Sequence, residues 1–121
     1  MSGYTKLQVW HRAMDLAALV YEAARGMKSE QFGMISQVTR AVASVPANIA
    51  EGYQRGTRKD YARFIGIARG SLAETQTFLL LAVRVGHLSQ DAVNPSLAAA
   101  DELSRMLTRL KRRLDGPPVG E

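Results

Sequence analysis

Apolar residues recur every three or four positions in four long segments of this chain, and this spacing constrains the fold more than any other feature. In the second segment the residues are Ile35, Val38, Val42, Val45 and Ile49, which share one face of a helix. No useful length alternates apolar and polar residues with the period of two that a half-buried strand shows. The pattern predicts helices over the ranges 6–27, 31–53, 58–85 and 95–114.

Polar residues mark where the first three helices should begin. Thr5 and Gln8 have the spacing of a capping box, in which each side chain bonds the backbone N–H of the other residue. Ser29 is suited to cap the second helix, and Thr57 is suited to cap the third.

The fourth helix has two possible starts. Asn94 followed by Pro95 favours a cap and a proline at the first helical position, although Ser89 allows a start about one turn earlier. The connections between the predicted helices are short, and short connections join antiparallel neighbours. We therefore predict an all-α, antiparallel up-down four-helix bundle that forms one domain over residues 1–121, with a flexible tail at 115–121.

Composition limits the classes of function. With 121 residues, 46% of them hydrophobic, the chain can bury a core, and the absence of cysteine excludes disulfides and thiolate metal sites. No apolar run approaches the length of about 18 residues needed to span a membrane, and no signal peptide is evident. We therefore expect a cytoplasmic protein without a membrane partner. The net charge of +5 weakly favours a polyanionic partner.

The second helix also carries a polar stripe, about 140° around from the apolar one at roughly 100° per residue. It contains short hydrogen-bonding groups, Ser44 and Asn48, between a cation and an anion, Arg40 and Glu51. A solvent-facing stripe would instead be rich in long flexible side chains. We predict a buried or interfacial polar seam, in which each donor needs a partner.

The third helix offers partners for this seam. Ser71 and Glu74 lie three residues apart, and we hypothesise that they join the stripe in one hydrogen-bonded network, either between the second and third helices or across subunits. Gly66 and Gly70 lie four apart and suggest close approach of another backbone, because each glycine costs a helix about 1 kcal/mol. Ordinary tight helix packing explains them better than a ligand site does.

Catalytic and metal chemistry is not indicated by the residues of the seam. Glu51 and Glu74 could pair around a metal, but no glutamate has the histidine three residues later that carboxylate-bridged sites in bundles use. Ser44 and Ser71 have no histidine base in a recognisable pattern. We predict no metal, no cofactor and no enzymatic activity.

Basic residues gather near the second interhelical turn and in the fourth helix. Lysine and arginine on an accessible face can contact phosphates without reading sequence, although a solvated helix surface explains such clusters almost as well. No RNA-recognition, zinc-finger or helix-turn-helix signature is present. The candidate nucleic-acid contacts are Arg55, Arg58, Lys59, Arg105, Arg109, Arg112 and Arg113.

The chain has more apolar surface than one bundle core uses. Phe78 and Val85 lie on a different face of the third helix from Tyr61 and Leu72, and Trp10 adds to the surplus in the first helix. Such a surplus predicts a homo-oligomer, which symmetry allows as a self-complementary dimer or as a closed ring.

Three stretches, VWHRAMDLAALVYEAA, QVTRAVASVPANIAEGYQR and YARFIGIARGSLAETQTFL, resemble the bacterial four-helix-bundle proteins of the 23S rRNA intervening-sequence type. The likeness covers about residues 7–86 and includes a signature of the form R-x-x-x-S-x-x-x-N-I-A-E-G followed by G-S-x-x-E. The signature falls on Arg40, Ser44, Asn48, Ile49, Ala50, Glu51, Gly52, Gly70, Ser71 and Glu74.

The resemblance implies a ring-shaped homopentamer. It also implies a relation to accessory proteins of diversity-generating retroelements, which bind nucleic acid, while no biochemical function is established for the family. Our interpretation of the sequence is a cytosolic, non-enzymatic homo-oligomer that associates with RNA or DNA. The alternative is a structural or protein-interaction scaffold without nucleic-acid binding.

Overall fold

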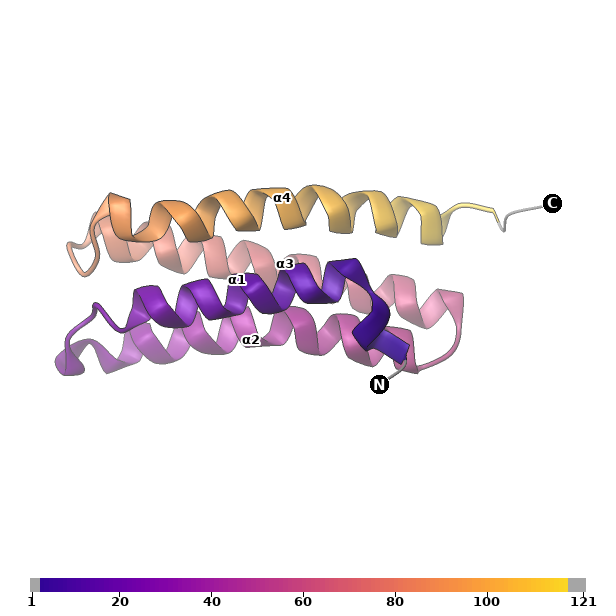
Figure 1. The fold of residues 1–121 in the computed structure, drawn as a ribbon, viewed down its shortest axis with the longest axis horizontal. Helices are drawn as coiled ribbons and strands as arrows, with labels where there is room; N and C mark the ends of the chain where they lie inside the picture. The colour runs from indigo at the N-terminus through magenta and orange to yellow at the C-terminus, as the bar shows by residue number, and fades with distance from the viewer. Residues whose placement is uncertain (1–2, 118–121) are drawn as a thin grey trace.

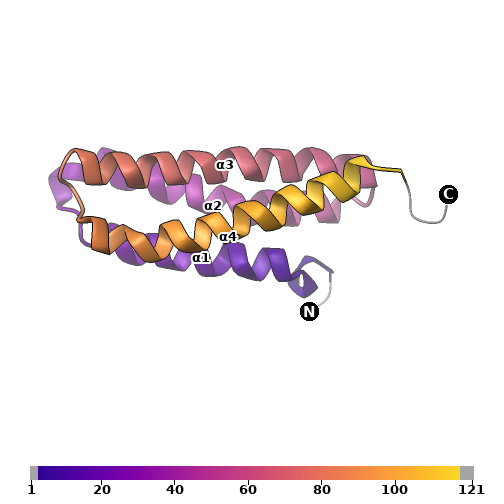
Figure 2. The ribbon, with the colours of Figure 1, turned by 90° about the horizontal axis from the view of Figure 1, so that it is seen from above.

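The computed structural model describes residues 3–117, and its long helices lie side by side (Figure 1). Each runs opposite to the one before it, as Figures 1 and 2 show, and no strand occurs in the described range. These features confirm the predicted all-α, antiparallel up-down four-helix bundle. The elements are the 3₁₀ turn η1 (Gly3–Lys6), α1 (Gln8–Ala24), the 3₁₀ turn η2 (Ser29–Gln31), α2 (Phe32–Gln54), α3 (Arg58–Arg84) and α4 (Gln90–Asp115).

The predicted apolar stripes form the core. In α2, Val42, Val45 and Ile49 are fully buried, and Leu72 of α3 and Leu107 of α4 are at most 1% exposed. Burying a side chain of this kind contributes about 1.5–3 kcal/mol relative to leaving it in water. The bundle is therefore held mainly by the faces that the three-four spacing brings together.

The starts of the first two helices differ from the prediction. α1 begins after Leu7 rather than after Thr5, because η1 occupies the predicted capping box and ends with a bond from the Leu7 N–H to the Tyr4 carbonyl at 2.9 Å. η2 begins at Ser29, so that residue does not cap α2. The Lys28 N–H before it donates to the Oε1 of Gln31 at 2.9 Å.

The starts of α3 and α4 follow the rules for capping. Thr57 caps α3 as predicted, and its hydroxyl accepts the Asp60 N–H at 3.1 Å. α4 starts at Gln90 rather than near residue 95, because Ser89 caps it by accepting the Ala92 N–H at 3.1 Å. The predicted cap at residue 94 is thus wrong.

Pro95 lies inside α4, within the first two turns. Proline there removes only its own N–H, which would otherwise bond the carbonyl four residues earlier, and the rest of the helix keeps its ladder. At the other end, Asp115 belongs to α4 rather than to the predicted tail, and residues 118–121 of that tail lie outside the described range.

Close contact between helices occurs at a different glycine from those that the sequence suggested. A Cβ on Gly52 of α2 would lie 2.5 Å from the Cβ of Phe64 on α3, closer than two such atoms can approach. Gly66 faces only the flexible side chain of Lys111, and a Cβ on Gly70 would meet nothing within 4 Å. Among the glycines of the described residues, Gly52 is the one at which α2 and α3 approach closely.

This difference predicts opposite effects of two glycine-to-alanine changes. Gly52→Ala should lower the melting temperature, because overpacking of this kind costs about 1–3 kcal/mol and Phe64 meets the new methyl group with an atom fixed to its backbone. Gly70→Ala should raise the free energy of unfolding by about 1 kcal/mol through helix propensity. Urea and thermal unfolding of both variants test this, and a Gly52→Ala protein as stable as the wild type would contradict the close approach.

Candidate nucleic-acid interface

The polar seam of α2 is satisfied largely by its own helix. The Ser44 hydroxyl donates to the Ala41 carbonyl at 2.7 Å, and the Asn48 amide donates to the Ser44 carbonyl at 2.7 Å. Glu51 accepts from Arg55 at 3.1 Å. Such local bonds are a common alternative for short polar side chains in helices. The hydrogen bonds of these residues therefore do not cross to α3.

Within residues 3–117, no side-chain hydrogen bond joins this stripe to the other members of the predicted network, which are Arg40 of α2 and Ser71 and Glu74 of α3. Arg40 and Glu74 are exposed, and their side chains have no hydrogen bond or ion pair within residues 3–117. Ser71 is buried at 8% exposure. α2 and α3 are antiparallel and touch at Gly52 and Phe64. Eight residues before Gly52 in α2 is Ser44, and eight residues after Phe64 in α3 is the residue that follows Ser71, so the two serines lie at nearly the same height along the bundle. The network does not form within the described chain, and its form across subunits stays a prediction.

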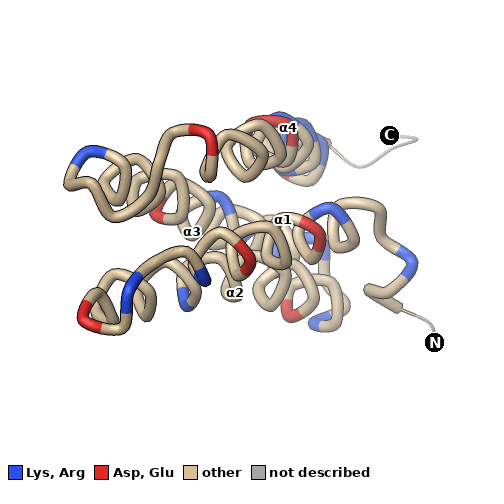
Figure 3. The backbone as a smooth tube through the Cα atoms, turned by 60° about the vertical axis from the view of Figure 1, so that its left-hand side comes forward, with Lys and Arg blue, Asp and Glu red and all other residues tan. Residues whose placement is uncertain are grey.

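One end of the bundle collects much of the positive charge. The start of α3 and the end of α4 meet there, together with the end of α2 and the start of α1 (Figures 1 and 2). Lysines and arginines follow one another along the last turns of α4 (Figure 3). We call this region the basic end, and its cations are Lys6, Arg55, Arg58, Lys59, Arg63, Arg69, Arg105, Arg109, Lys111, Arg112 and Arg113.

Some of the predicted phosphate contacts already have partners. Arg58 donates to backbone carbonyls at the end of α4, to Leu114 at 3.0 Å and to Gly116 at 3.3 Å, so it caps that helix from α3. Arg105 pairs with Asp101 at 2.5 Å, and Arg55 pairs with Glu51. Arg55 and Arg105 each have a carboxylate four residues earlier in the chain, so neither can contact phosphate without first breaking an ion pair.

The remaining predicted contacts are unpaired. Lys59, Arg109, Arg112 and Arg113 are exposed, and within the part of the chain that the structure describes their side chains have no carboxylate partner. They can therefore contact phosphate without first breaking an ion pair.

Two arginines of α3, Arg63 and Arg69, were not among the predicted contacts. Arg63 lies over the Phe64 ring, with its guanidinium carbon 4.5 Å from the centroid. Arg69 lines a depression of about 430 Å³ with Arg112 of α4. Each is three residues from Gly66, which places it about 60° from Gly66 around the axis of α3 at roughly 100° per residue. Gly66 faces Lys111 of α4, so both arginines lie near the side of α3 that packs on α4. Arg63 belongs by sequence to the basic cluster at the second interhelical turn, whereas Arg69 could be found only once the packing partner of that face was known.

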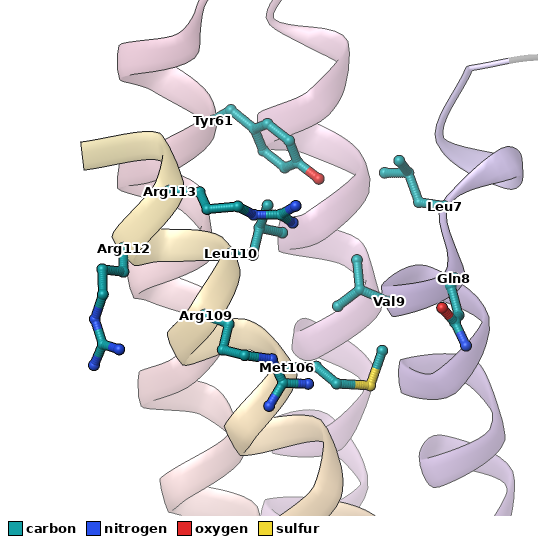
Figure 4. Close-up of a pocket in the computed structure, with 9 residues that line it drawn as sticks. All are labelled: Leu7, Gln8, Val9, Tyr61, Met106, Arg109, Leu110, Arg112 and Arg113. Atoms are coloured by element: carbon teal, nitrogen blue, oxygen red, sulfur yellow. The ribbon is translucent and has the colours of Figure 1, made fainter. Parts of the chain in front are cut away.

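A groove of about 650 Å³ lies between the start of α1 and the last turns of α4. Figure 4 shows the Tyr61 ring entering it from α3, with Arg113 and Arg109 reaching across it and Arg112 turned to the other side of α4. Burial raises the pKa of Tyr61 above the ordinary 10.0, and Tyr53 adds to the rise, while the positive charge of Arg113 opposes it. Tyr61 is therefore a neutral hydroxyl at neutral pH.

The described residues contain no group of three or more histidine, aspartate or glutamate side chains that could hold a metal ion. Among the same residues, no helix is both long enough and apolar enough to cross a bilayer. The predicted absence of an enzymatic activity and of a cofactor stays a prediction.

Comparisons with known proteins agree with the fold. A family model described as "23S rRNA-intervening sequence protein" matches residues 5–109. The chain is also similar to the crystal structure of a protein with unknown function from the S23 ribosomal protein family of Bacteroides thetaiotaomicron. The two share 24% identity with a TM-score of 0.79, and the match covers 86% of this chain and 98% of that one. At this identity the likeness establishes the fold alone. No curated protein matches.

The capping role of Arg58 predicts a difference between two adjacent cations. Arg58→Ala should lower the free energy of unfolding by about 1 kcal/mol, because bonds from a charged donor contribute about 1.5–3 kcal/mol and solvent exposure reduces this. Lys59→Ala removes the same charge without breaking a bond and serves as the control. Equal urea midpoints for the two variants would contradict the role of Arg58.

Proposed function

The chain belongs to the family of 23S rRNA-intervening sequence proteins, and we propose that it is a non-enzymatic, cytoplasmic homo-oligomer that binds the sugar–phosphate backbone of RNA or DNA. One observation carries the nucleic-acid part of this proposal. Arg109, Arg112 and Arg113 lie on the last turns of α4 without an ion pair in the described part of the chain, and Arg69 of α3 lies beside Arg112. Binding of this kind takes most of its free energy from the release of counterions and does not depend on base sequence.

The arrangement of cations supports a broad contact surface rather than a single anion site. Lys59 and Arg63 border a depression of about 510 Å³ between α3 and α4, and Arg69 and Arg112 border the neighbouring one. Phosphates follow one another along a nucleic-acid strand, so cations spread over two helices can be neutralised by one ligand.

Self-association is supported by exposed apolar side chains on α3. Leu80 is 52% exposed and Val85 is 51% exposed, and Ile67 and Leu81 are exposed as well. Arg40 and Glu74 are exposed charges of opposite sign that have no ion pair among residues 3–117. We favour the ring of five subunits that the family resemblance implies. Such a ring would present five basic ends, whose weak contacts would add through avidity.

A scaffold without nucleic-acid binding is the second candidate. It is favoured by the internal use of Arg58 and by the ion pairs of Arg55 and Arg105, which reduce the free positive charge at the basic end. The two candidates differ in one measurable property, the salt-dependent affinity for oligonucleotides.

Replacing the three arginines of α4 by glutamine tests the nucleic-acid part. The variant Arg109→Gln, Arg112→Gln, Arg113→Gln should bind mixed-sequence duplexes much more weakly. Its plot of log affinity against log salt should be shallower by about 0.9 for each phosphate that the variant no longer neutralises. The control replaces Arg25, Lys28 and Arg84, at the other end of the bundle, and changes the net charge equally.

Fluorescence anisotropy with labelled RNA and DNA duplexes measures both variants. An unchanged affinity for the α4 variant, or an equal loss in the control, would contradict binding at the basic end. Absence of binding by the wild type at about 50 mM salt and micromolar protein would favour the scaffold.

The oligomer is tested by light scattering coupled to gel filtration. The wild type should have a mass well above the 13.2 kDa of one chain. Leu80→Asp should shift it toward the monomer, because a charge would have to be buried in the interface. Ala98→Asp places the same charge on the exposed side of α4 and should leave the mass unchanged. A monomeric wild type would refute self-association, and a dimer would refute only the ring.

A further inference from the structure

We propose that the groove between the start of α1 and the end of α4 holds one unpaired nucleotide, with its base on the apolar floor and its phosphate on Arg109 and Arg113. This inference rests on the proposed function, since it describes how a single strand would engage the same basic end. A pocket for an unpaired base would make the protein prefer single strands, a preference that contacts to the sugar–phosphate backbone alone do not give.

The floor of the groove suits the flat face of a base. Leu7, just before α1, and Val9, in its first turn, line one side, and Met106 and Leu110 of α4 line the other (Figure 4). The volume of about 650 Å³ falls in the range of about 300–1,000 Å³ that is common for small-molecule pockets. Methionine adapts to irregular shapes, so Met106 allows bases of different size to fit.

Tyr61 supplies an aromatic ring inside the groove. Tyr53 packs against it edge-on, with ring centroids 5.6 Å apart, and this contact limits how the ring can turn. Single-strand binding proteins stack bases on rings of this kind, and the stacking tolerates any base. The neutral hydroxyl of Tyr61 can also donate a hydrogen bond to a base carbonyl.

The charges around the groove fit a phosphate beside the base. Arg109 and Arg113 reach across it, and none of its lining residues is acidic. Gln8 at its edge carries an amide, which can both donate to and accept from the edge of a base. A simple anion would leave the apolar floor exposed to water. A fatty-acid anion would gain nothing from the hydrogen-bonding groups of Tyr61 and Gln8.

Methyl NMR tests the pocket without requiring nucleic-acid binding elsewhere. In a titration of the wild-type protein with adenosine monophosphate, the methyl resonance of Met106 should shift in a saturable way. Met27 and Met34, at the opposite end of the bundle, should not move. An unmoved Met106 would overturn the proposal, and so would an equal response to inorganic phosphate or tighter binding of decanoate.

Variants then connect the pocket to strand binding. Tyr61→Ala should weaken binding of a short mixed-sequence single strand about tenfold, the scale of one base stack, and should leave duplex binding unchanged. Arg113→Gln should weaken adenosine monophosphate binding, whereas Arg84→Gln, which removes the same charge at the other end of the bundle, should not. If Tyr61→Ala perturbs folding, Tyr61→Phe, which keeps the ring and loses the hydroxyl, should retain most of the single-strand preference.

The outcomes separate the two proposals. A shift of Met106 by the nucleotide without any duplex binding would sustain the pocket and refute backbone binding at the basic end. The opposite result has two parts: duplex binding depends on the α4 arginines, and Tyr61→Ala weakens single-strand and duplex binding equally. This result would sustain the proposed function and refute the pocket.

Discussion

The contact of Gly52 with Phe64 sets the geometry of the basic end. It allows the last turns of α2 and the first turns of α3 to approach more closely than a side chain at position 52 would permit. Phe64 then receives guanidinium groups from both helices, with Arg55 at 5.0 Å and Arg63 at 4.5 Å from its centroid. Both arginines stay exposed to solvent, so each of these cation–π contacts contributes about 0.5–1 kcal/mol. One glycine thus brings cations of two helices to the same ring, and Tyr61, one turn before Phe64, enters the groove on the other side.

The fold could be predicted from the sequence because the buried positions recur with the period of the α-helix. Val42, Val45 and Ile49 had to face one way, and four such stripes leave few packings other than a bundle. Helix starts were less certain because several residues could cap. Ser89 and the residues around position 94 both satisfied local rules, and only the packing of α4 on the bundle decided between them. Thr5 failed as a cap because the preceding turn continues through it.

The site was harder to predict because sequence shows which groups are present and not which partners they take. Ser44 and Asn48 looked like members of a network between helices, yet each bonds a carbonyl of its own helix. Arg58 looked like a phosphate contact and instead bonds the end of α4, more than fifty residues along the chain. Arg69 gave no local signal at all, since its neighbour across the interface, Arg112, comes from another helix. Partners of this kind become visible only when distant segments are placed together.

The last turns of α4 present their charge in two directions, and this separates two properties of the basic end. Arg109 and Arg113 are four residues apart and share the side of the groove, whereas Arg112 lies about 100° from Arg113 and faces Arg69. Arg112 and Arg69 are exposed and can attract any polyanion, with a strength that falls as salt rises. Arg109 and Arg113 lie beside an apolar floor and a tyrosine, where shape and stacking matter as much as charge. A substitution of Tyr61 can therefore change the preference for unpaired bases while it leaves the charge of α4, and with it the general affinity, intact.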